Sequence, residues 1–477
     1  MVENTLLSEA AEASEVLMLK RFIGDRAFYR RVLGIAVPIL IQNGITNFVS
    51  MLDNLMVGQI GTIQMSSVSI ANQLIFIFNL CVFGAASGAG IFTAQFHGKQ
   101  DHEGIRHTFR FKNLACFIIS LLGIGIFLGF GKNLIGLYLQ GEGDPREAAM
   151  SLGYGISYLR IMLVGLIPFA ISNAYSSTLR ESGQAVVPMI AGICAVFVNL
   201  VLNYILIFGH LGMPALGVQG AAIATVISRF VELAVVAVWT HTHSKLHPFI
   251  QGVYRSIHIP KDLLMQIIQK GMPLLLNEFL WSTGMAIINQ SYSTCGLNVV
   301  PAMNIAATIN NLSSVVYMSI GNAIGILMGQ ILGCGTEEHE VRTTNRKLIF
   351  MGVTAGAIFG IILFSISGLF PMAFNTTEAV RSLAATLICI GAVLMPFHAF
   401  TFATFFTLRS GGQSWITFVF DSGYVWAICV PLAFCLSRFT GLSIIPLYAI
   451  CQSTEFIKCF LGAWMLHKGS WIKNLTQ

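Results

Sequence analysis

Five carboxylates stand in apolar segments of the sequence, where a charged side chain needs either a partner or a task. They are Asp53, Glu232, Glu278, Asp421 and Glu455. A charged side chain at the centre of a bilayer costs at least about 2.5–3.5 kcal/mol. Arg229 precedes Glu232 by three positions, and Glu455 precedes Lys458 by three. Residues at this spacing share a helix face, so we predict two structural ion pairs, Arg229–Glu232 and Glu455–Lys458.

Asp53 has no basic residue close by in its own segment, and it lies on a stripe of polar residues. Gln42, Thr46, Ser50 and Asp53 follow one another at spacings of 4, 4 and 3, which places them on one helical face. A polar stripe inside a membrane faces a bundle interior or a wet cavity. Desolvation favours the protonated form of a carboxylate. We therefore predict that Asp53 gains and loses a proton; the alternative is a carboxylate that only hydrogen-bonds a neighbouring helix.

Glu278 lies on a second polar face, which also carries Ser282 and Asn289 at helical spacing. We predict that this face borders a substrate cavity and that Glu278 takes part in cation coupling. Trp281 stands beside it. Its indole either stacks on a flat cationic substrate or packs between helices.

Asp421 and His398 are the remaining titratable candidates within apolar runs. Asp421 serves an ion path or pairs with Arg409, and the sequence leaves both open. His398 is either a core residue with a hydrogen-bond partner or a titrating group, because histidine changes charge near neutral pH.

The segments that must position these residues are membrane spans. The chain has 477 residues, of which 55% are hydrophobic and 10% charged, whereas soluble domains carry about 25% charged residues. The mean hydropathy is +0.74. A span needs about 20 apolar residues. Twelve such segments occur, at about 32–57, 67–96, 111–130, 153–179, 187–208, 217–240, 263–293, 300–332, 348–370, 381–408, 414–436 and 442–466.

Basic residues are distributed unevenly between the two sides of these spans. With the N-terminus inside, 20 Lys and Arg lie on the inner side and 4 on the outer side. This asymmetry predicts that both termini are cytoplasmic in a multi-pass protein of the cell membrane. It also explains the net charge of +6 without a nucleic-acid patch. The first 31 residues lack a signal-peptide pattern and are predicted to be a cytoplasmic tail.

No pattern in the sequence indicates an enzyme, a metal site or a bound cofactor. The ten cysteines show no C-x-x-C spacing, and most lie in apolar runs, as expected of small core residues. No zinc motif or nucleophile elbow is present. We therefore expect a non-enzymatic membrane protein with no cofactor and no metal.

The sequence contains an internal repeat, in which the second half of the chain resembles the first half. "SGAGIFTAQFHGKQDHEG" (87–104) corresponds to "NAIGILMGQILGCGTEEH" (322–339) at an offset of 235, and "TLRESGQ" (178–184) returns as "TLRSGGQ" (407–413). Each half holds six spans, so the repeats are parallel. Transporters built in this way place their substrate site between the halves. The predicted domains are a tail (1–31), an N-lobe (32–240), a cytoplasmic linker (241–262), a C-lobe (263–466) and a C-terminal tail (467–477).

Several motifs in this order resemble the multidrug and toxic compound extrusion (MATE) family, over residues 30–475. They are "VPILIQNGITNFVSMLDNLMVGQIG", "NLVLNYILIFGHLGMPALGVQGAAIATVISR", "AQFHGK", "GQILGCG" and "WIKNL". The resemblance implies an all-α protein with twelve transmembrane helices in two six-helix lobes. It also implies alternating access and export of organic cations in exchange for inward H⁺ or Na⁺.

The resemblance also implies roles for single residues. An acid at the position of Asp53 is central to cation coupling in the family, and Asn199 and Asn203 lie beside it. Some members carry Asp where this chain has Asn203, and that Asp helps to bind Na⁺; the amide therefore favours H⁺ here. Many members have an acid on the seventh span, as Glu278 is. A purely structural role for the two amides remains open.

The sequence thus predicts a monomeric antiporter that lies in the lipid bilayer and exports small organic cations across the cell membrane in exchange for H⁺, with Na⁺ as the alternative ion. A rival reading is a flippase for lipids or lipid-linked precursors. Such a flippase should line its cavity with basic residues, whereas this chain has one unpaired basic residue in a span, Arg160, and three unpaired acids. A second rival is a receptor or scaffold that transports nothing.

Overall fold

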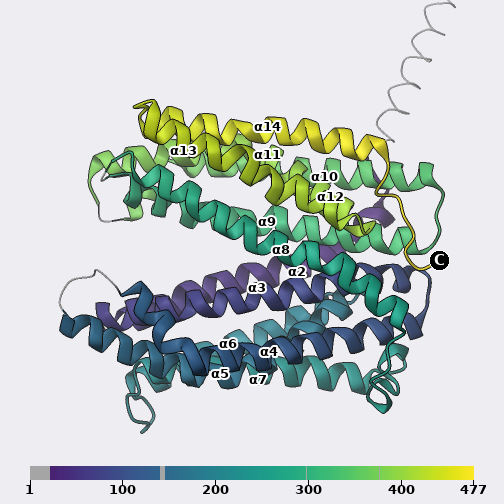
Figure 1. Cartoon of the computed structure of the whole chain (residues 1–477), viewed down its shortest axis with the longest axis horizontal. Coiled ribbons are helices and arrows are strands. Elements are labelled where there is room, and N and C mark those ends of the chain that lie inside the picture. Colours follow the sequence, from purple (N-terminus) through teal and green to yellow (C-terminus); the bar gives the residue numbers. More distant parts are fainter. Residues whose placement is uncertain (1–21, 140–144, 297, 375) are drawn as a thin grey trace, which may run out of the picture. The chain divides into compact units, whose positions relative to one another are not determined.

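The chain folds entirely into helices over the residues that the computed structural model describes, which are 22–139, 145–296, 298–374 and 376–477. Figure 1 shows them in chain order. The α-helices are α2 (Arg26–Gly58), α3 (Thr62–Gly98), α4 (His102–Tyr138), α5 (Pro145–Glu181), α6 (Val186–Phe208), α7 (Val218–Thr242), α8 (Lys261–Ser293), α9 (Val299–Gly333), α10 (Glu338–Ile366), α11 (Glu378–Ser410), α12 (Ser414–Phe418), α13 (Val430–Phe439) and α14 (Ile444–Lys468). Shorter helical turns are η1 (Pro248–Ile250), η2 (Val253–Arg255), η3 (Phe370–Ala373), η4 (Val419–Gly423) and η5 (Val425–Cys429).

The predicted spans correspond to long helices. Within the described residues, 11 helical segments are long and apolar enough to cross a membrane, counting Ser414–Phe439 as one. The remaining predicted span, the seventh in order, is α8, which has 33 residues but is less apolar because it carries Asn277, Glu278 and Asn289. The predicted fold class, a polytopic all-α protein of two six-helix repeats, is confirmed.

The helices form two compact units, of which one is a continuous stretch of the chain and the other combines its two ends. Unit 2 comprises Ile41–Leu275, and unit 1 comprises the residues up to Leu40 together with Leu276–Gln477. The boundaries fall inside α2 and α8, two residues after Pro38 and two residues after Pro273. The sequence predicts that the two lobes start at residues 32 and 263. In the structure, α2 and α8 each begin in one unit and end in the other.

Contacts at the starts of α2 and α8 show which unit each helix begins in. In unit 1, Arg31 of α2 donates to the side-chain oxygen of Gln330 on α9 at 3.1 Å. In unit 2, a Cβ added at Gly88 of α3 would lie 2.5 Å from Cα of Gly271 on α8. The glycine-rich stretch 84–90 therefore allows close helix packing, as small residues do in membranes.

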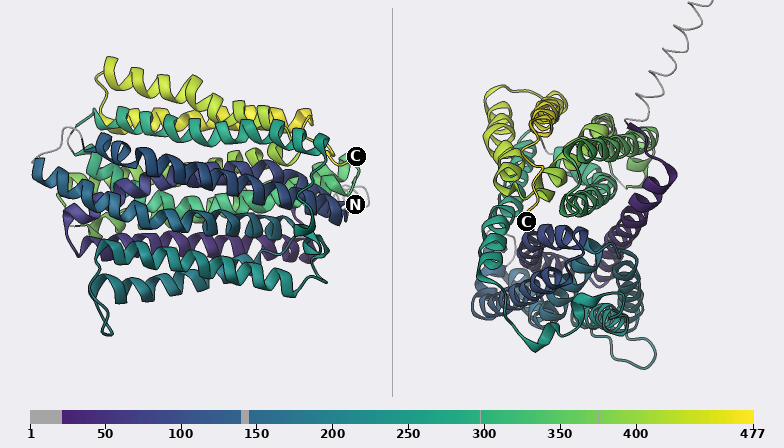
Figure 2. Two further views of the ribbon diagram at one scale, coloured as in Figure 1. Left: turned by 60° about the horizontal axis from the view of Figure 1, so that its bottom comes forward. Right: turned by 90° about the vertical axis from the view of Figure 1, so that its right-hand side faces the viewer.

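The two units pack their helices in the same pattern. In unit 2, α5 packs against α3, α4 and α7; in unit 1, α11 packs in the same way against α9, α10 and α14. Figure 2 shows the helices of each unit lying side by side. Each unit has its own apolar core, around Phe78 and Leu166 in unit 2 and around Leu387 and Tyr448 in unit 1. The internal repeat of the sequence is thus a repeat of packing.

The eleventh span is not a regular α-helix. It begins as α12, continues through the wide π-helical turns η4 and η5, and ends as α13. π-Turns are uncommon and occur frequently at functional sites. Here η4 carries Asp421.

The segment after α7 packs on unit 2 instead of hanging free. Phe249, Ile250 and Val253 are each 2% exposed. Arg106 donates to the carbonyl oxygen of Phe249 at 3.2 Å, and Arg110 donates to that of Val253 at 2.8 Å. Two basic residues that the sequence assigns to an inner loop therefore hold this segment against α4.

Candidate functional site

Asp53 lies among neutral amides. The amide of Asn203 donates to Oδ1 of Asp53 at 2.6 Å, and Asn199 lies one turn before Asn203 on α6. Asn199 and Asn203 are 4% and 1% exposed. With the Asn199 amide oriented to satisfy its neighbours, it also donates to Asp53 at 3.0 Å and accepts from Thr225 of α7 at 3.2 Å. Three helices thus meet at one carboxylate.

The amides of Asn199 and Asn203 can hydrogen-bond to Asp53 in either of its charge states, ionised or protonated. A side-chain amide presents either its NH₂ group or its carbonyl oxygen, depending on its orientation. In the orientation described, Oδ1 of Asn203 is buried without a hydrogen-bond partner among the described residues. An acceptor without a donor is costly in a buried site. A proton on Asp53 would supply the missing donor once the amides turn.

The hydroxyls of the stripe before Asp53 are occupied by their own helix. Thr46 donates to the carbonyl oxygen of Gln42 at 2.8 Å, and Ser50 donates to that of Thr46 at 3.0 Å. Gln42 accepts from Arg180 of α5 at 3.3 Å. Thr46 and Ser50 are exposed, so the stripe is polar but is not bonded to another helix through these hydroxyls.

Arg229 and Glu232 lie 3.2 Å apart on α7, with side chains 33% and 14% exposed. The guanidinium group of Arg229 also sits 4.8 Å from the ring centroid of Phe169 on α5. A cation over an aromatic face is attracted by the ring. This arrangement agrees with the predicted pairing of these two residues.

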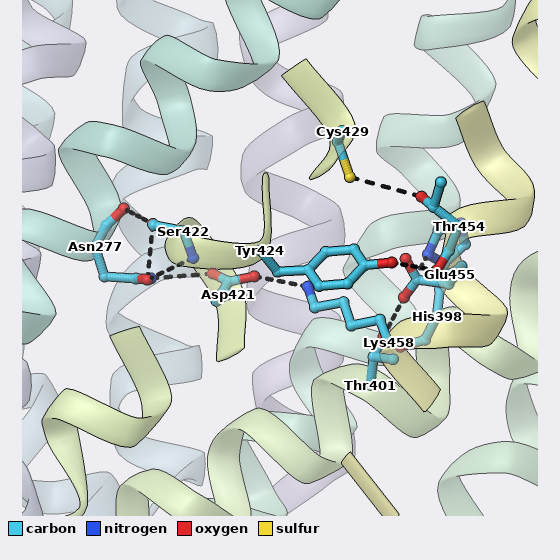
Figure 3. A network of polar contacts seen from close by, with 10 residues as sticks. All are labelled: Asn277, His398, Thr401, Asp421, Ser422, Tyr424, Cys429, Thr454, Glu455 and Lys458. Atoms are coloured by element: carbon cyan, nitrogen blue, oxygen red, sulfur yellow. Dashed lines mark hydrogen bonds and ion pairs between the residues drawn. The ribbon is translucent and has the colours of Figure 1, made fainter. Parts of the chain in front are cut away.

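In unit 1 the corresponding network is richer in charge, as Figure 3 shows. Lys458 of α14 donates to Oδ1 of Asp421 at 2.8 Å. Asn277 of α8 donates to Oδ2 of Asp421 at 3.0 Å. Ser422 donates to Oδ1 of Asn277 at 2.8 Å. Asp421 therefore has Lys458 as its ionic partner, where the sequence suggested Arg409.

Glu455 bonds away from Lys458, which corrects the predicted Glu455–Lys458 pair. Its Oε1 accepts from Thr401 at 2.5 Å and lies 3.4 Å from Nδ1 of His398. The spacing of three placed both charges on one side of α14, but each reaches a different neighbouring helix. His398 and Thr401 come from α11, whereas Asp421 comes from the π-helical turn. His398 is accordingly neither isolated nor apolar in its surroundings.

Glu278 makes no hydrogen bond or ion pair within the part of the chain that the structure describes. The charges of Arg409 and Asp421 nevertheless act on it. Its side chain is partly buried, as is that of Ser282, whereas Asn289 is exposed and Trp281 is 37% exposed. All four residues belong to unit 1, whereas Asp53 belongs to unit 2.

The repeat relates the two networks with inverted charge. Phe169 corresponds to His398 at the offset of 229 that relates 178–184 to 407–413, and Arg229 corresponds to Glu455 at an offset of 226. In unit 2 a cation lies over an aromatic ring; in unit 1 an anion faces an imidazole. The same α5–α7 and α11–α14 contacts thus carry opposite chemistry.

Sequence reasoning missed several polar residues of these networks. Asn277 precedes Glu278 directly, so an amide beside an acid was the available signal. Lys112 was counted among inner basic residues, yet it is fully buried and forms an ion pair with Glu181 and a hydrogen bond to Thr178 at 3.1 Å. A lysine at the border of an apolar segment gives no sign of this.

Comparison with known proteins identifies the family. The MatE family model matches residues 38–205 and 273–435, two stretches that begin at Pro38 and Pro273. The "Probable multidrug resistance protein NorM" of Thermotoga maritima is 23% identical over 446 residues, covering 93% of each chain. The "Probable multidrug resistance protein YoeA" of Bacillus subtilis is 25% identical over 422 residues, covering 86% of this chain and 88% of that protein.

Solved structures show the same fold. The outward-facing conformation of a multidrug resistance MATE family transporter of the MOP superfamily superposes with a TM-score of 0.82 at 18% identity, covering 94% of this chain and 97% of that one. A MOP superfamily transporter from Pyrococcus furiosus gives a TM-score of 0.79 at 19% identity, with 94% and 97% covered. With its repeated helical units and a family match over most of its length, this chain belongs to the MATE family of multidrug efflux transporters.

Proposed function

We propose that this transporter exports organic cations across the cell membrane in exchange for inward H⁺, and that Asp53 is the group that carries the proton. The observation on which this rests is the difference between the two networks. Asp53 is held by neutral amides and forms no ion pair among the described residues, whereas Asp421 and Glu455 already face Lys458 and His398.

The hydrogen-bond partners of Asp53 are neutral amides, and the positive charge of Arg229 acts on it; both features support H⁺ over Na⁺. A Na⁺ site needs several oxygen ligands, and negative ligands strengthen it. Asn203 stands where a second acid would add a negative charge, so Asp53 is the one carboxylate at this point of unit 2. Amides that can turn suit a carboxyl group that alternates between accepting and donating a hydrogen bond.

Coupling follows if proton and cargo favour different states of the same site. A ligand shifts a conformational equilibrium only by its differential affinity for the two states. Ionised Asp53 attracts an organic cation. Protonation from outside removes that attraction and favours release, and return to the inward state discharges the proton. One proton that moves inward across ~100 mV supplies about 2.3 kcal/mol.

Further parts of the proposal rest on the sequence. The basic residues, 20 against 4 on the two sides of the predicted spans, support cytoplasmic termini. We propose a monomer in the lipid bilayer, with small organic cations as substrates and no cofactor besides the coupling ion. The polar faces around Gln42, Trp281, Ser282 and Asn289 are proposed to border the substrate path.

The test uses the purified full chain in liposomes loaded with a fluorescent organic cation. Efflux is measured under a pH gradient and, separately, under a Na⁺ gradient at matched membrane potential. We expect the pH gradient alone to drive efflux and Asp53→Asn to abolish it. Asp262→Asn is the matched control, because Asp262 is exposed at the start of α8 and lies outside the network.

Two outcomes would contradict the proposal. Efflux that follows the Na⁺ gradient would replace H⁺ by Na⁺ as the coupling ion. If neither gradient moves the cation although the protein is folded and correctly inserted, cation export is wrong. A lipid cargo is then tested next, by the accessibility of a labelled lipid in the two leaflets.

A further inference from the structure

Lys458 holds a position inside unit 1 that a free cation would otherwise be expected to take. Its ammonium group lies 2.8 Å from Oδ1 of Asp421, and the two side chains are 12% and 16% exposed. The same ammonium lies 5.3 Å from the ring centroid of Phe420. A positive charge, a carboxylate and an aromatic face are thus gathered at one point between α14 and the π-helical turn η4; Figure 3 shows Lys458 and Asp421 there.

The surroundings of the ammonium are built to stabilise a monovalent cation. Asn277 fixes the second oxygen of Asp421 at 3.0 Å, and its own carbonyl oxygen accepts from the hydroxyl of Ser422. Glu455 adds a second carboxylate one turn before Lys458 on α14. Asp421 and Glu455 thus place two carboxylates near one lysine in this part of unit 1. Loss of the ammonium would leave two buried carboxylates with at most one partial counter-charge.

The internal repeat does not place a lysine at the position of unit 2 that is equivalent to Lys458. The position equivalent to Lys458 in unit 2, at the offset of 226, is Glu232. Unit 2 places its fixed cation one turn earlier, at Arg229, where it faces Glu232 and Phe169. Asp53 therefore keeps amide partners in unit 2, whereas Asp421 in unit 1 has a cation tethered to it.

We propose that the Lys458 ammonium is a tethered monovalent cation, which fills a cation-binding position formed by the Asp421 carboxylate beside the ring of Phe420, and so keeps Na⁺ out of unit 1. An ammonium and a sodium ion carry the same charge and both take oxygen ligands. The tether makes occupancy independent of the Na⁺ concentration. The inference concerns ion binding alone, but it gives the proposed H⁺ coupling a physical reason.

The π-helical turn suits this arrangement. A regular α-helix returns its side chains every 3.6 residues, whereas the wider turn of η4 displaces Asp421 and Ser422 from that register. Both residues then face Asn277 on α8. A change of one residue in the winding of this span would separate the carboxylate from Lys458, which ties the position to the shape of the turn.

The experiment replaces the tethered cation and asks whether a free one takes its place. Lys458→Met keeps an unbranched side chain that is one heavy atom shorter and removes the charge. Binding of radioactive Na⁺ and the melting temperature are measured on the purified full chain, as NaCl replaces choline chloride at constant ionic strength. We expect no specific Na⁺ binding in unit 1 of the wild type. In Lys458→Met we expect saturable binding of one Na⁺ and a melting temperature that rises with Na⁺.

The matched control is the double variant Asp421→Asn/Lys458→Met, which removes both charges of the pair. It should lose the gained Na⁺ binding. If Lys458→Met is folded and binds no more Na⁺ than the wild type or the double variant, the proposal is wrong. If Lys458→Met is recovered as folded protein in NaCl but not in choline chloride, Na⁺ stabilises it as proposed. If it is recovered in neither while the double variant folds, no cation replaces the ammonium, and the proposal fails.

These readouts are separate from transport. A wild type that shows no H⁺-driven efflux refutes the proposed function but leaves the Na⁺ binding of Lys458→Met to be judged by itself. Conversely, H⁺-driven efflux with no Na⁺ binding in the variant would retain the antiporter and remove only the tethered cation.

Discussion

At the scale of single residues, the buried charges of this transporter differ in how firmly their neighbours hold them. Lys112 is fully buried, and Glu181 and Thr178 surround its ammonium. Removing one partner of such a pair is strongly destabilising because the other charge stays buried alone. Gly90 on α3 is the wall of this site, since an added Cβ would lie 2.3 Å from Oε1 of Glu181.

Gly90→Ala should therefore destabilise the protein. The carboxylate of Glu181 is fixed by Lys112 and cannot move aside without weakening the ion pair. Overpacking of this kind costs about 1–3 kcal/mol, which should lower the melting temperature. Gly125→Ala is the control, because a Cβ there meets nothing within 4 Å; alanine in a helix should leave stability unchanged or raise it by about 0.5–1 kcal/mol. Equal melting temperatures in the two variants would contradict the close packing of Gly90 against Glu181.

At the scale of elements, sequence patterns predicted which segments are helices and on which faces their polar residues lie. They could not predict the partners across helices. Arg229 and Glu232 pair within one helix, so their spacing was sufficient. Glu455 and Lys458 have the same spacing, but a π-helical turn and α11 supply nearer partners. Long side chains reach several neighbours, and only the packing of the neighbouring helices selects one.

The segment after α7 is an element whose stability should depend on pH. His247 is 5% exposed, and burial, together with the nearby charge of His243, lowers the pKa of His247 below its ordinary value. Its Nε2 has no hydrogen-bond partner within the described residues. The packed segment therefore keeps His247 neutral, whereas the open segment takes up a proton below about pH 6.5. Stability from this group is complete above that pH and is lost as the pH falls.

Hydrogen exchange of residues 248–258, corrected for intrinsic rates, should accordingly be faster at pH 5.5 than at pH 7.5. The opening equilibrium should rise by up to about tenfold per pH unit within the window between the two pKa values. His247→Leu fills the same apolar surroundings of Trp239 and Phe249 and should weaken the pH dependence. The remainder comes from His107, which contacts the carbonyl oxygen of His258 and whose pKa is also lowered by burial. If the variant opens with the same pH dependence, His247 is not the responsible group.

At the scale of the whole molecule, the repeat of packing does not extend to the charges. The equivalent of Asp53 at the offset of 235 is Ile288, and the equivalent of Glu278 is Asn43. Helix order and packing follow the apolar pattern, which both halves share, so the fold could be predicted from the sequence. The polar sites differ between the halves, and each had to be found from its contacts.

The orientation of the molecule in the membrane gives a further prediction. A fluorescent protein fused after Gln477 should fluoresce in intact bacterial cells, because such a fusion matures only on the cytoplasmic side. An alkaline phosphatase fusion at the same position should be inactive, and the same fusion in the connection between α4 and α5 should be active. The reverse pattern would invert the topology predicted from the basic residues.

The placement of the unit boundaries inside α2 and α8 determines how motion can be transmitted. The chain passes from one unit to the other within these two helices. The units are therefore connected by continuous helices and not by flexible linkers at these two points. Turning the end of α2 that carries Asp53 must either turn residues 26–40 in the other unit or bend the helix at Pro38, where a backbone hydrogen bond is missing. The same holds for Glu278 and Pro273 on α8. Two continuous helices thus connect the backbone of one unit to that of the other.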